Sequence, residues 1–197
     1  WKLSEMPEEA RARSKIISDA LGIPSLVADL MVQRGIENTS DAEAFLRADL
    51  MDLEDPNLLK DMEKAVERII RGMEEGEKIV VYGDYDVDGI TSICVLVGVL
   101  ASLGASVDYY IPDRVDEGYG MNSEAVRSIA KDGASLLITV DCGITAFLEV
   151  QLAESLGMDV IVTDHHEPHG EIPSAVAVIN PKRHDELYPF RDLAGVG

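Results

Sequence analysis

Three carboxylates stand at alternate positions, 84, 86 and 88, of the segment G-D-Y-D-V-D-G that spans residues 83–89. So much negative charge in so short a segment is costly unless a cation lies among the side chains. The pattern D-x-D-x-D-G also begins the calcium loop of an EF-hand, which requires a bidentate glutamate at its twelfth position. The twelfth residue counted from Asp84 is Val95, so the calcium-loop interpretation fails.

Further candidate metal ligands lie downstream, at Asp141 and in the run Asp164-His165-His166. Carboxylate oxygens together with neutral imidazole suit Mn²⁺, Mg²⁺ or Zn²⁺ better than a metal that prefers thiolates, and the mixture fits Mn²⁺ well. We expect two ions in a complete site. The expected direct ligands are Asp86, Asp88, Asp141 and His165. The expected supporting partners, or terminal ligands to one of the ions, are Asp84, Asp164 and His166.

Two ions roughly 3.5 to 4 Å apart can hold a water as hydroxide and draw charge from a phosphoryl oxygen. In-line hydrolysis of a phosphoester is therefore the expected reaction, and it needs no serine or cysteine nucleophile. If His166 is not a ligand, we expect its imidazole to face the scissile phosphate, where it stabilises negative charge or assists the leaving oxygen. A single aspartate after a strand is more often a helix cap or a turn former, so the prediction rests on the whole set.

Alternating strands and helices are expected to bring these residues together. Short β-branched runs predict strands at 78–82, 107–111, 136–140, 160–163 and 175–179, and helical patterns lie near 90–103, 123–131 and 145–156. This alternation predicts an α/β fold, with a mostly parallel sheet covered by helices on both faces. Ligands bind outside the carboxyl ends of such strands. Because every candidate residue follows a predicted strand, we expect the candidates to converge at one edge of the sheet.

Residues 1 to about 75 have helical patterns and no cluster of titratable residues suited to catalysis. Ser40 with Glu43 fits a capping box, and apolar residues recur at helical spacing from Met62 to Met73. We therefore divide the chain into a helical N-terminal segment, residues 1–75, and an α/β domain, residues 76–197.

The composition is that of a folded chain, because 46% of its 197 residues are hydrophobic. No run approaches the roughly 18 apolar residues of a membrane span, and the first residues lack the apolar centre of a secretion signal. We therefore expect a cytoplasmic protein with no membrane partner. Cys94 and Cys142 both lie in apolar segments and are expected to be structural thiols.

The formal charge of −20 argues against a simple nucleic-acid binder, because contacts to phosphate need Lys and Arg. Bound divalent cations would offset part of this charge. Four basic residues fall near the predicted strand ends where a site would lie, namely Arg114, Lys182, Arg183 and Arg191.

The ordered motifs resemble the DHH phosphoesterase superfamily, named for the Asp-His-His at 164–166, and within it the RecJ family of single-strand-specific DNA exonucleases. The three-letter DHH alone is weak evidence, whereas the ordered set is specific. The motifs are L-L-K-D-M at 58–62, V-Y-G-D-Y-D-V-D-G-I-T-S at 81–92, I-P-D-R-V-D-E-G-Y-G-M-N at 111–122, V-D-C-G-I at 140–144, V-T-D-H-H-E-P at 162–168, I-N-P-K-R at 179–183 and L-A-G-V-G at 193–197.

This resemblance implies hydrolysis of single-stranded DNA from its 5′ end to mononucleotides, with Mn²⁺ or Mg²⁺, in recombination and repair. Replication and repair proteins are the implied protein partners. Carried over motif by motif, the ligand set given above looks like the family's metal ligands, and His166 looks like the group that faces the substrate phosphate. Arg114 and Tyr119 look like nucleotide contacts, although a loop salt bridge and a packed ring explain them equally well.

In this family the pattern continues beyond L-A-G-V-G. The resemblance therefore implies that a further metal aspartate and a second, basic domain lie outside these residues. We expect the DHH domain to be truncated at its C-terminal end, which accounts for the acidic balance and leaves open whether this segment is active alone.

Other functions stay open. An oligonucleotide or cyclic-dinucleotide phosphodiesterase shares the core chemistry, but the helical N-terminal segment and the motif at 111–122 favour the exonuclease. A non-catalytic replication scaffold related to DHH proteins is disfavoured because the acidic residues are retained. An inorganic pyrophosphatase expects a histidine where Tyr82 stands, and a response-regulator domain leaves the paired histidines unexplained.

Overall fold

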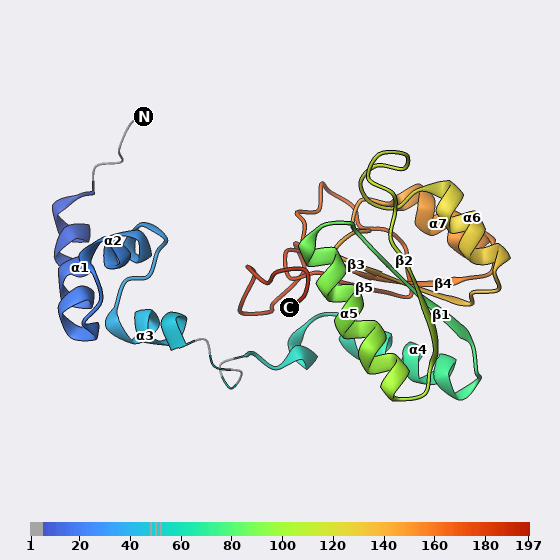
Figure 1. The fold of residues 1–197 in the computed structure, drawn as a ribbon, viewed down its shortest axis with the longest axis horizontal. Helices are drawn as coiled ribbons and strands as arrows, with labels where there is room; N and C mark the ends of the chain where they lie inside the picture. Colours follow the sequence, from blue (N-terminus) through green and yellow to red (C-terminus); the bar gives the residue numbers. More distant parts are fainter. Residues whose placement is uncertain (1–5, 48, 50, 52) are drawn as a thin grey trace. The chain divides into compact units, whose positions relative to one another are not determined.

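The computed structural model describes residues 6–47, 49, 51 and 53–197, which form two compact units divided after Leu53 (Figure 1). The first unit consists of α1 (Glu8–Leu21), α2 (Ser25–Gln33) and α3 (Thr39–Arg47). Its core is formed by Ile17, Ala28, Met31 and Ala42.

The predicted capping box at Ser40 is wrong. Helix α3 already begins at Thr39, and Asn38 occupies the capping position. The Asn38 Oδ1 accepts from the backbone N–H of Asp41 at 2.9 Å, and the Asn38 Nδ2 donates to the Asp41 carboxylate at 2.8 Å. Asparagine is as good an N-cap as serine, so the reciprocal bonds form earlier in the chain than the serine pattern indicates.

The second unit contains a sheet of five parallel strands in the order β2-β1-β3-β4-β5, which confirms the predicted fold class. The strands are β1 (Lys78–Gly83), β2 (Ser106–Tyr110), β3 (Leu136–Val140), β4 (Asp159–Thr163) and β5 (Ala177–Ile179). The helices are α4 (Met62–Glu74), α5 (Val87–Ser102), α6 (Ser123–Lys131) and α7 (Phe147–Ser155), and a 3-10 turn at Pro56–Leu58 precedes α4.

Helices cover both faces of this sheet (Figure 1). Because side chains alternate along a strand, Val80 and Tyr82 of β1 face α6 and α7, whereas Ile79 and Val81 face α4 and α5. All but β2 are buried through most of their length, as expected for parallel strands with helices on both sides.

Helix α4 packs on the sheet, so the compact unit begins at Glu54 and not at the predicted boundary of 75/76. The Arg68 side chain is buried, its Nε donates to the Asp159 carboxylate at 2.5 Å, and its NH2 donates to Glu77 at 2.7 Å. Glu77 directly precedes β1 and Asp159 is the first residue of β4, so both partners belong to the sheet side of the contact. The sequence pattern of α4 shows only that it is an amphipathic helix, and does not show which unit its apolar face covers.

Strand order places a switch point between β1 and β3. The chain runs from β1 outward to β2 and then returns to β3 on the other side. In doubly wound sheets the crevice at this point, outside the carboxyl ends of the strands, is where ligands bind. The acidic loop 83–89 follows β1 and Asp141 follows β3, so the chain's densest carboxylates flank this crevice.

Within the part of the chain that the structure describes, no helix is both long enough and apolar enough to cross a bilayer. Both cysteines are free. Cys142 is buried and Cys94 is exposed, so the expectation of a structural thiol fits only Cys142.

Gly89 lies at the start of α5, where the chain passes close to its own loop. A Cβ at this position would lie 2.3 Å from the backbone oxygen of Asp84, and backbone cannot move away cheaply. We expect Gly89→Ala to lower the free energy of unfolding by about 1–3 kcal/mol, measured by urea denaturation. Gly98→Ala is the matched control in the same helix, because a Cβ there meets nothing within 4 Å. The control should be neutral or stabilising, by up to roughly 1 kcal/mol. Equal effects of the two substitutions would contradict the prediction.

Candidate functional site

The acidic loop after β1 is shaped by its own hydrogen bonds. Asp86 is the N-cap of α5, and its Oδ1 accepts from the backbone N–H groups of Asp88 and Gly89 at 2.9 and 3.0 Å. These bonds lower the pKa of Asp86, with that to Gly89 the largest cause. One oxygen of the carboxylate is therefore engaged as a helix cap, the ordinary role of an aspartate after a strand.

Asp141 lies directly after β3 and is 1% exposed. Its backbone is left-handed, with φ at 58°, a conformation that a non-glycine residue adopts at some cost. Neither carboxylate oxygen makes a hydrogen bond within the part of the chain that the structure describes. Burial, and then the charges of Asp86 and Asp88, raise the pKa of Asp141 to about 7.

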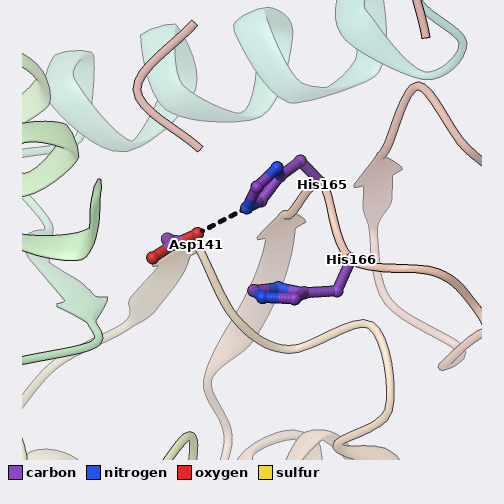
Figure 2. Close-up of side chains that lie close together, drawn as sticks. All are labelled: Asp141, His165 and His166. Carbon is purple, nitrogen blue, oxygen red and sulfur yellow. Dashed lines mark ion pairs between the residues drawn. The ribbon is translucent and has the colours of Figure 1, made fainter. Parts of the chain in front are cut away.

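His165 follows β4 and directs its ring at Asp141 (Figure 2). Its Nε2 lies 3.1 Å from the Asp141 Oδ1 and 3.7 Å from the Asp88 Oδ2. The other ring nitrogen, Nδ1, lies 3.0 Å from the backbone carbonyl of Leu193, which can only accept a hydrogen bond. In a neutral ring the Nδ1 therefore carries the proton, and the lone pair of Nε2 points at two carboxylates. That arrangement requires a proton or a cation between the groups.

A divalent metal fits this donor set. Ligand atoms of Asp141, His165 and His166 all lie within 4.8 Å of one another, and Figure 2 shows the two imidazoles and the carboxylate around a common space. Among the described residues neither buried oxygen of Asp141 makes a hydrogen bond, and the Oδ1 faces the His165 Nε2. The Nδ1 bond to a backbone carbonyl orients His165 as in many metal sites.

Asp88 faces the same space from the first turn of α5. Its two oxygens accept from the backbone N–H groups of Gly195 and Val196 at 2.9 and 3.3 Å. A Cβ at Gly195 would lie 2.4 Å from the Asp141 Oδ1, so glycine is required where this segment crosses the site. The residues after β5 thus pack directly against the candidate ligands.

Asp164 holds His166 in place. Its Oδ1 lies 2.7 Å from the His166 Nδ1 and accepts from the backbone N–H groups of His165 and His166, and its Oδ2 accepts from the Ile144 N–H at 2.9 Å. The far ring nitrogen of His166, Nε2, lies 3.1 Å from the Tyr119 hydroxyl. The order is carboxylate, imidazole, phenol, an arrangement that can hold and move a proton.

Asp84 is fully buried behind the loop. Its Oδ1 lies 3.5 Å from the Gly120 N–H, and within the described part of the chain its Oδ2 has no partner. A buried carboxylate with an open oxygen suits a supporting role beside a cation. Its predicted place behind the ligands agrees with this burial, although its role stays a prediction.

The loop after β2 brings Arg114 and Tyr119 to the same edge of the sheet. The Arg114 guanidinium stacks 5.3 Å from the ring centroid of Tyr85, and the Tyr119 ring meets Tyr85 edge to face at 6.3 Å. Glu117 holds the loop by accepting from the Tyr110 hydroxyl at 2.6 Å and from the Asp113 N–H at 2.7 Å. Arg114 and Tyr119 are both exposed, so neither the predicted loop salt bridge nor a packed ring describes them fully.

The four basic residues expected near the strand ends differ in their surroundings. Arg183 is buried, with its NH1 2.8 Å from Asp61 and its Nε 2.9 Å from Asp185, so its charge serves the fold. Lys182 and Arg191 stay accessible, as Arg114 does. Arg183 follows β5 as expected, but its contacts with Asp61 and Asp185 neutralise its charge.

Sequence reasoning assigned no role to Asn180, Tyr85 or the backbone of residues 193–197. Asn180 is fully buried, and its side chain donates to the His166 carbonyl at 2.9 Å. The position of Asn180 directly after a strand could have marked it as a candidate site residue. The contact made by the Leu193 carbonyl could not be predicted in this way, because a backbone group is present in every residue type.

Comparisons with known proteins agree with this geometry. A family model described as "DHH family, N-terminal domain" matches residues 78–197. The chain is 46% identical over 197 residues to "Single-stranded-DNA-specific exonuclease RecJ" of Bacillus subtilis (strain 168), covering 100% of this chain and 25% of that protein. It is 34% identical over 200 residues to the protein of the same name from Thermus thermophilus, covering 100% and 28%.

Two solved structures are similar. "Crystal structure of exonuclease RecJ bound to manganese" matches with a TM-score of 0.65 and 39% identity, covering 71% of this chain and 35% of that one. A crystal structure of RecJ from Thermus thermophilus in complex with Mn²⁺ matches with a TM-score of 0.68 and 31% identity, covering 99% and 26%. The chain therefore spans about a quarter to a third of the length of these relatives.

The raised pKa of Asp141 predicts how metal-free stability changes with pH. Between the ordinary value of 3.8 and about 7, the folded protein keeps a proton on Asp141 that the unfolded chain has released. The contribution of Asp141 to the free energy of unfolding therefore falls as pH rises through this window, by at most about 1.4 kcal/mol per pH unit, and is constant above it.

The comparison is with Asp141→Asn, measured by urea denaturation in EDTA from pH 4 to 8. Asparagine has the same shape, tolerates a left-handed backbone and does not titrate. The variant should gain stability relative to the wild type as pH rises from about 4 to 7. A difference that stays flat across this window would show that Asp141 has an ordinary pKa.

Proposed function

Because this chain belongs to the DHH family, we propose that it is part of a divalent-metal-dependent exonuclease that degrades single-stranded DNA from the 5′ end to mononucleotides. The observation that carries the proposal is the convergence of Asp141, His165 and His166, whose ligand atoms lie within 4.8 Å at the switch point of the sheet. The names of the similar proteins support the substrate class. Roles in recombination and repair, contacts with repair proteins and a cytoplasmic location belong to the same proposal.

Asp141, His165 and Asp88 are the residues we propose to hold the ion, with the open oxygen of Asp86 reaching the same group. The similar structures contain Mn²⁺, which carboxylate and imidazole ligands suit. When bound, such an ion supplies an activated water and withdraws charge from a phosphoryl oxygen. The protein's part is to keep the His165 proton on Nδ1, facing the Leu193 carbonyl, so that Nε2 is free.

His166 is the residue we propose to act on the leaving oxygen. Its Nδ1 lies 2.7 Å from the Asp164 carboxylate, which fixes the orientation of the ring. The Nε2 at the other end faces the Tyr119 hydroxyl, and the side chain is half exposed to the crevice. From this position a protonated ring can donate to an oxygen that leaves phosphorus, or stabilise the charge that develops there.

A surface for unstacked bases lies next to His166. The Tyr85 and Tyr119 rings, together with the Arg114 guanidinium above Tyr85, offer π-faces and a positive charge on which a base can stack. Such stacking is worth about 1–3 kcal/mol per base and tolerates any sequence. Duplex DNA presents no free base faces, which agrees with a preference for single strands.

The test of this function uses the complete polypeptide that contains these residues, incubated with Mn²⁺ and single strands labelled at either end. We expect release of a labelled mononucleotide from the 5′-labelled strand at the earliest times, and little cleavage of duplex DNA or of di- and cyclic dinucleotides. Faster hydrolysis of the short or cyclic substrates would replace the exonuclease with a phosphodiesterase of the same family. Absence of hydrolysis on every substrate would support a scaffold.

His166→Ala separates the proposed proton donor from the metal ligands. We expect the variant to retain Mn²⁺ binding in equilibrium dialysis while its rate on single-stranded DNA falls by roughly 10²- to 10⁴-fold. Asp141→Ala should lose both properties, and Asp132→Ala, an exposed carboxylate on a distant turn, should lose neither. If His166→Ala loses Mn²⁺ as completely as Asp141→Ala, His166 is a ligand and our assignment of its role is wrong.

A further inference from the structure

A groove begins at His166 and follows residues of the loops after β4 and β5. Its first part is a cavity of about 730 Å³ lined by Tyr119, Asp164, His166, Glu149, His169 and Lys182. A second cavity of about 550 Å³ follows, lined by Glu167, Lys182, His184 and Arg191. The two cavities share Glu167 and Lys182, so they form one continuous surface depression, which we call the β5-exit groove.

Basic side chains gather in this groove, although the chain as a whole carries a formal charge of −20. Lys182 and Arg191 belong to it, and His169 and His184 add imidazoles. The Arg191 NH2 donates to the Lys182 carbonyl at 3.1 Å, which keeps the guanidinium beside the lysine. Three carboxylates, Glu149, Asp164 and Glu167, line the same groove, so the ammonium and guanidinium groups are the parts of it that can bind an anion.

The buried side-chain amide of Asn180 connects the groove to the backbone of His166. Asn180 is 0% exposed, its Nδ2 donates to the His166 carbonyl at 2.9 Å, and its Oδ1 accepts from the Lys182 N–H at 2.7 Å. The loop after β4 and the loop after β5 are thereby tied together. Lys182 therefore stands at a set position relative to the imidazole, and does not sit on an independent surface loop.

The acidic side chains of the groove leave Lys182 available. Asp164 is fully engaged with His166 and backbone N–H groups, and Glu149 lies 3.4 Å from the Ser123 hydroxyl. Glu167 is the one carboxylate near Lys182 among the described residues, with 3.9 Å between Nζ and Oε1, and its side chain is 66% exposed. A pair of this length with so exposed a carboxylate contributes little, so a phosphate can replace the carboxylate.

We propose that the β5-exit groove binds a phosphate group of the single strand next to the one being cut, with Lys182 as its main contact and Arg191 as the second. This inference rests on the proposed function and adds a subsite to it. The first cavity lies in the size range of sites that enclose a small ligand, about 300–1,000 Å³, and so has room for one nucleotide unit. His166 and Lys182 both line this cavity, so one strand can contact both residues.

The experiment measures binding separately from hydrolysis. The dissociation constant of a fluorescent single-stranded oligonucleotide for the complete polypeptide is determined by anisotropy in EDTA, at several salt concentrations. Lys182→Ala keeps the backbone N–H that Asn180 needs, so the loop should stay in place. We expect affinity to fall about 3- to 10-fold and the slope of log affinity against log salt to shrink by about 0.7, the contribution of one phosphate contact on a single strand.

Three further variants control this result. Lys182→Arg should preserve the slope, Glu167→Gln should strengthen binding because it removes the competing carboxylate, and Lys131→Ala, an exposed lysine at the end of α6, should change nothing. If Lys182→Ala binds with the same affinity and slope as Lys131→Ala, the groove is not a phosphate site. Hydrolysis with Mn²⁺ is assayed in parallel, so a failure of the proposed activity appears as binding without product.

Competition by a deoxynucleoside monophosphate shows whether the bound phosphate belongs to the leaving nucleotide or to the retained strand. If the groove holds the leaving nucleotide, Lys182→Ala lowers the affinity for both the monophosphate and the oligonucleotide. If it holds the retained strand, the substitution lowers only the affinity for the oligonucleotide. Either pattern supports the phosphate site and assigns its place along the strand.

Discussion

A carboxylate that is 1% exposed and lies beside two other carboxylates is stable in its ionised form only next to positive charge. Asp141 is in this position, and its surroundings follow from that requirement. The Nε2 of His165 lies 3.1 Å from the Asp141 Oδ1, and Asp88 approaches from α5. A proton on Asp141 meets this requirement without an ion, and under our proposal a divalent ion would take the place of that proton.

The sheet makes this concentration of charge achievable. Five parallel strands deliver their loops to one edge, and the switch between β1 and β3 leaves a crevice at that edge. Residues separated by nearly the whole α/β unit meet there, and among the candidate ligands only Asp141 has a left-handed backbone. The loops after β1 and β3 bring carboxylates to this edge, the loop after β4 brings two imidazoles, and Tyr85 and Tyr119 come from the loops after β1 and β2.

Much of this arrangement could be predicted from the sequence, and the misses have physical causes. The bounds of β3 and α6 match their predicted ranges. The strand is a continuous buried run, and the apolar residues of the helix recur with the 3.6-residue period of an α-helix. The place of α4 could not be predicted, because its partner Asp159 lies 91 residues from Arg68. The convergence of Asp141 with the two histidines followed from strand order. The tautomer of His165 did not, since a backbone carbonyl sets it.

The contacts of residues 193–197 also affect the order in which the chain folds during its synthesis on the ribosome. Asp88 bonds to the N–H of Gly195, 107 residues later, and the Leu193 carbonyl orients His165. Contacts of such long range form late, after the loops between them have closed. A nascent polypeptide can thus complete its sheet before the contacts of residues 193–197 with Asp88 and His165 form.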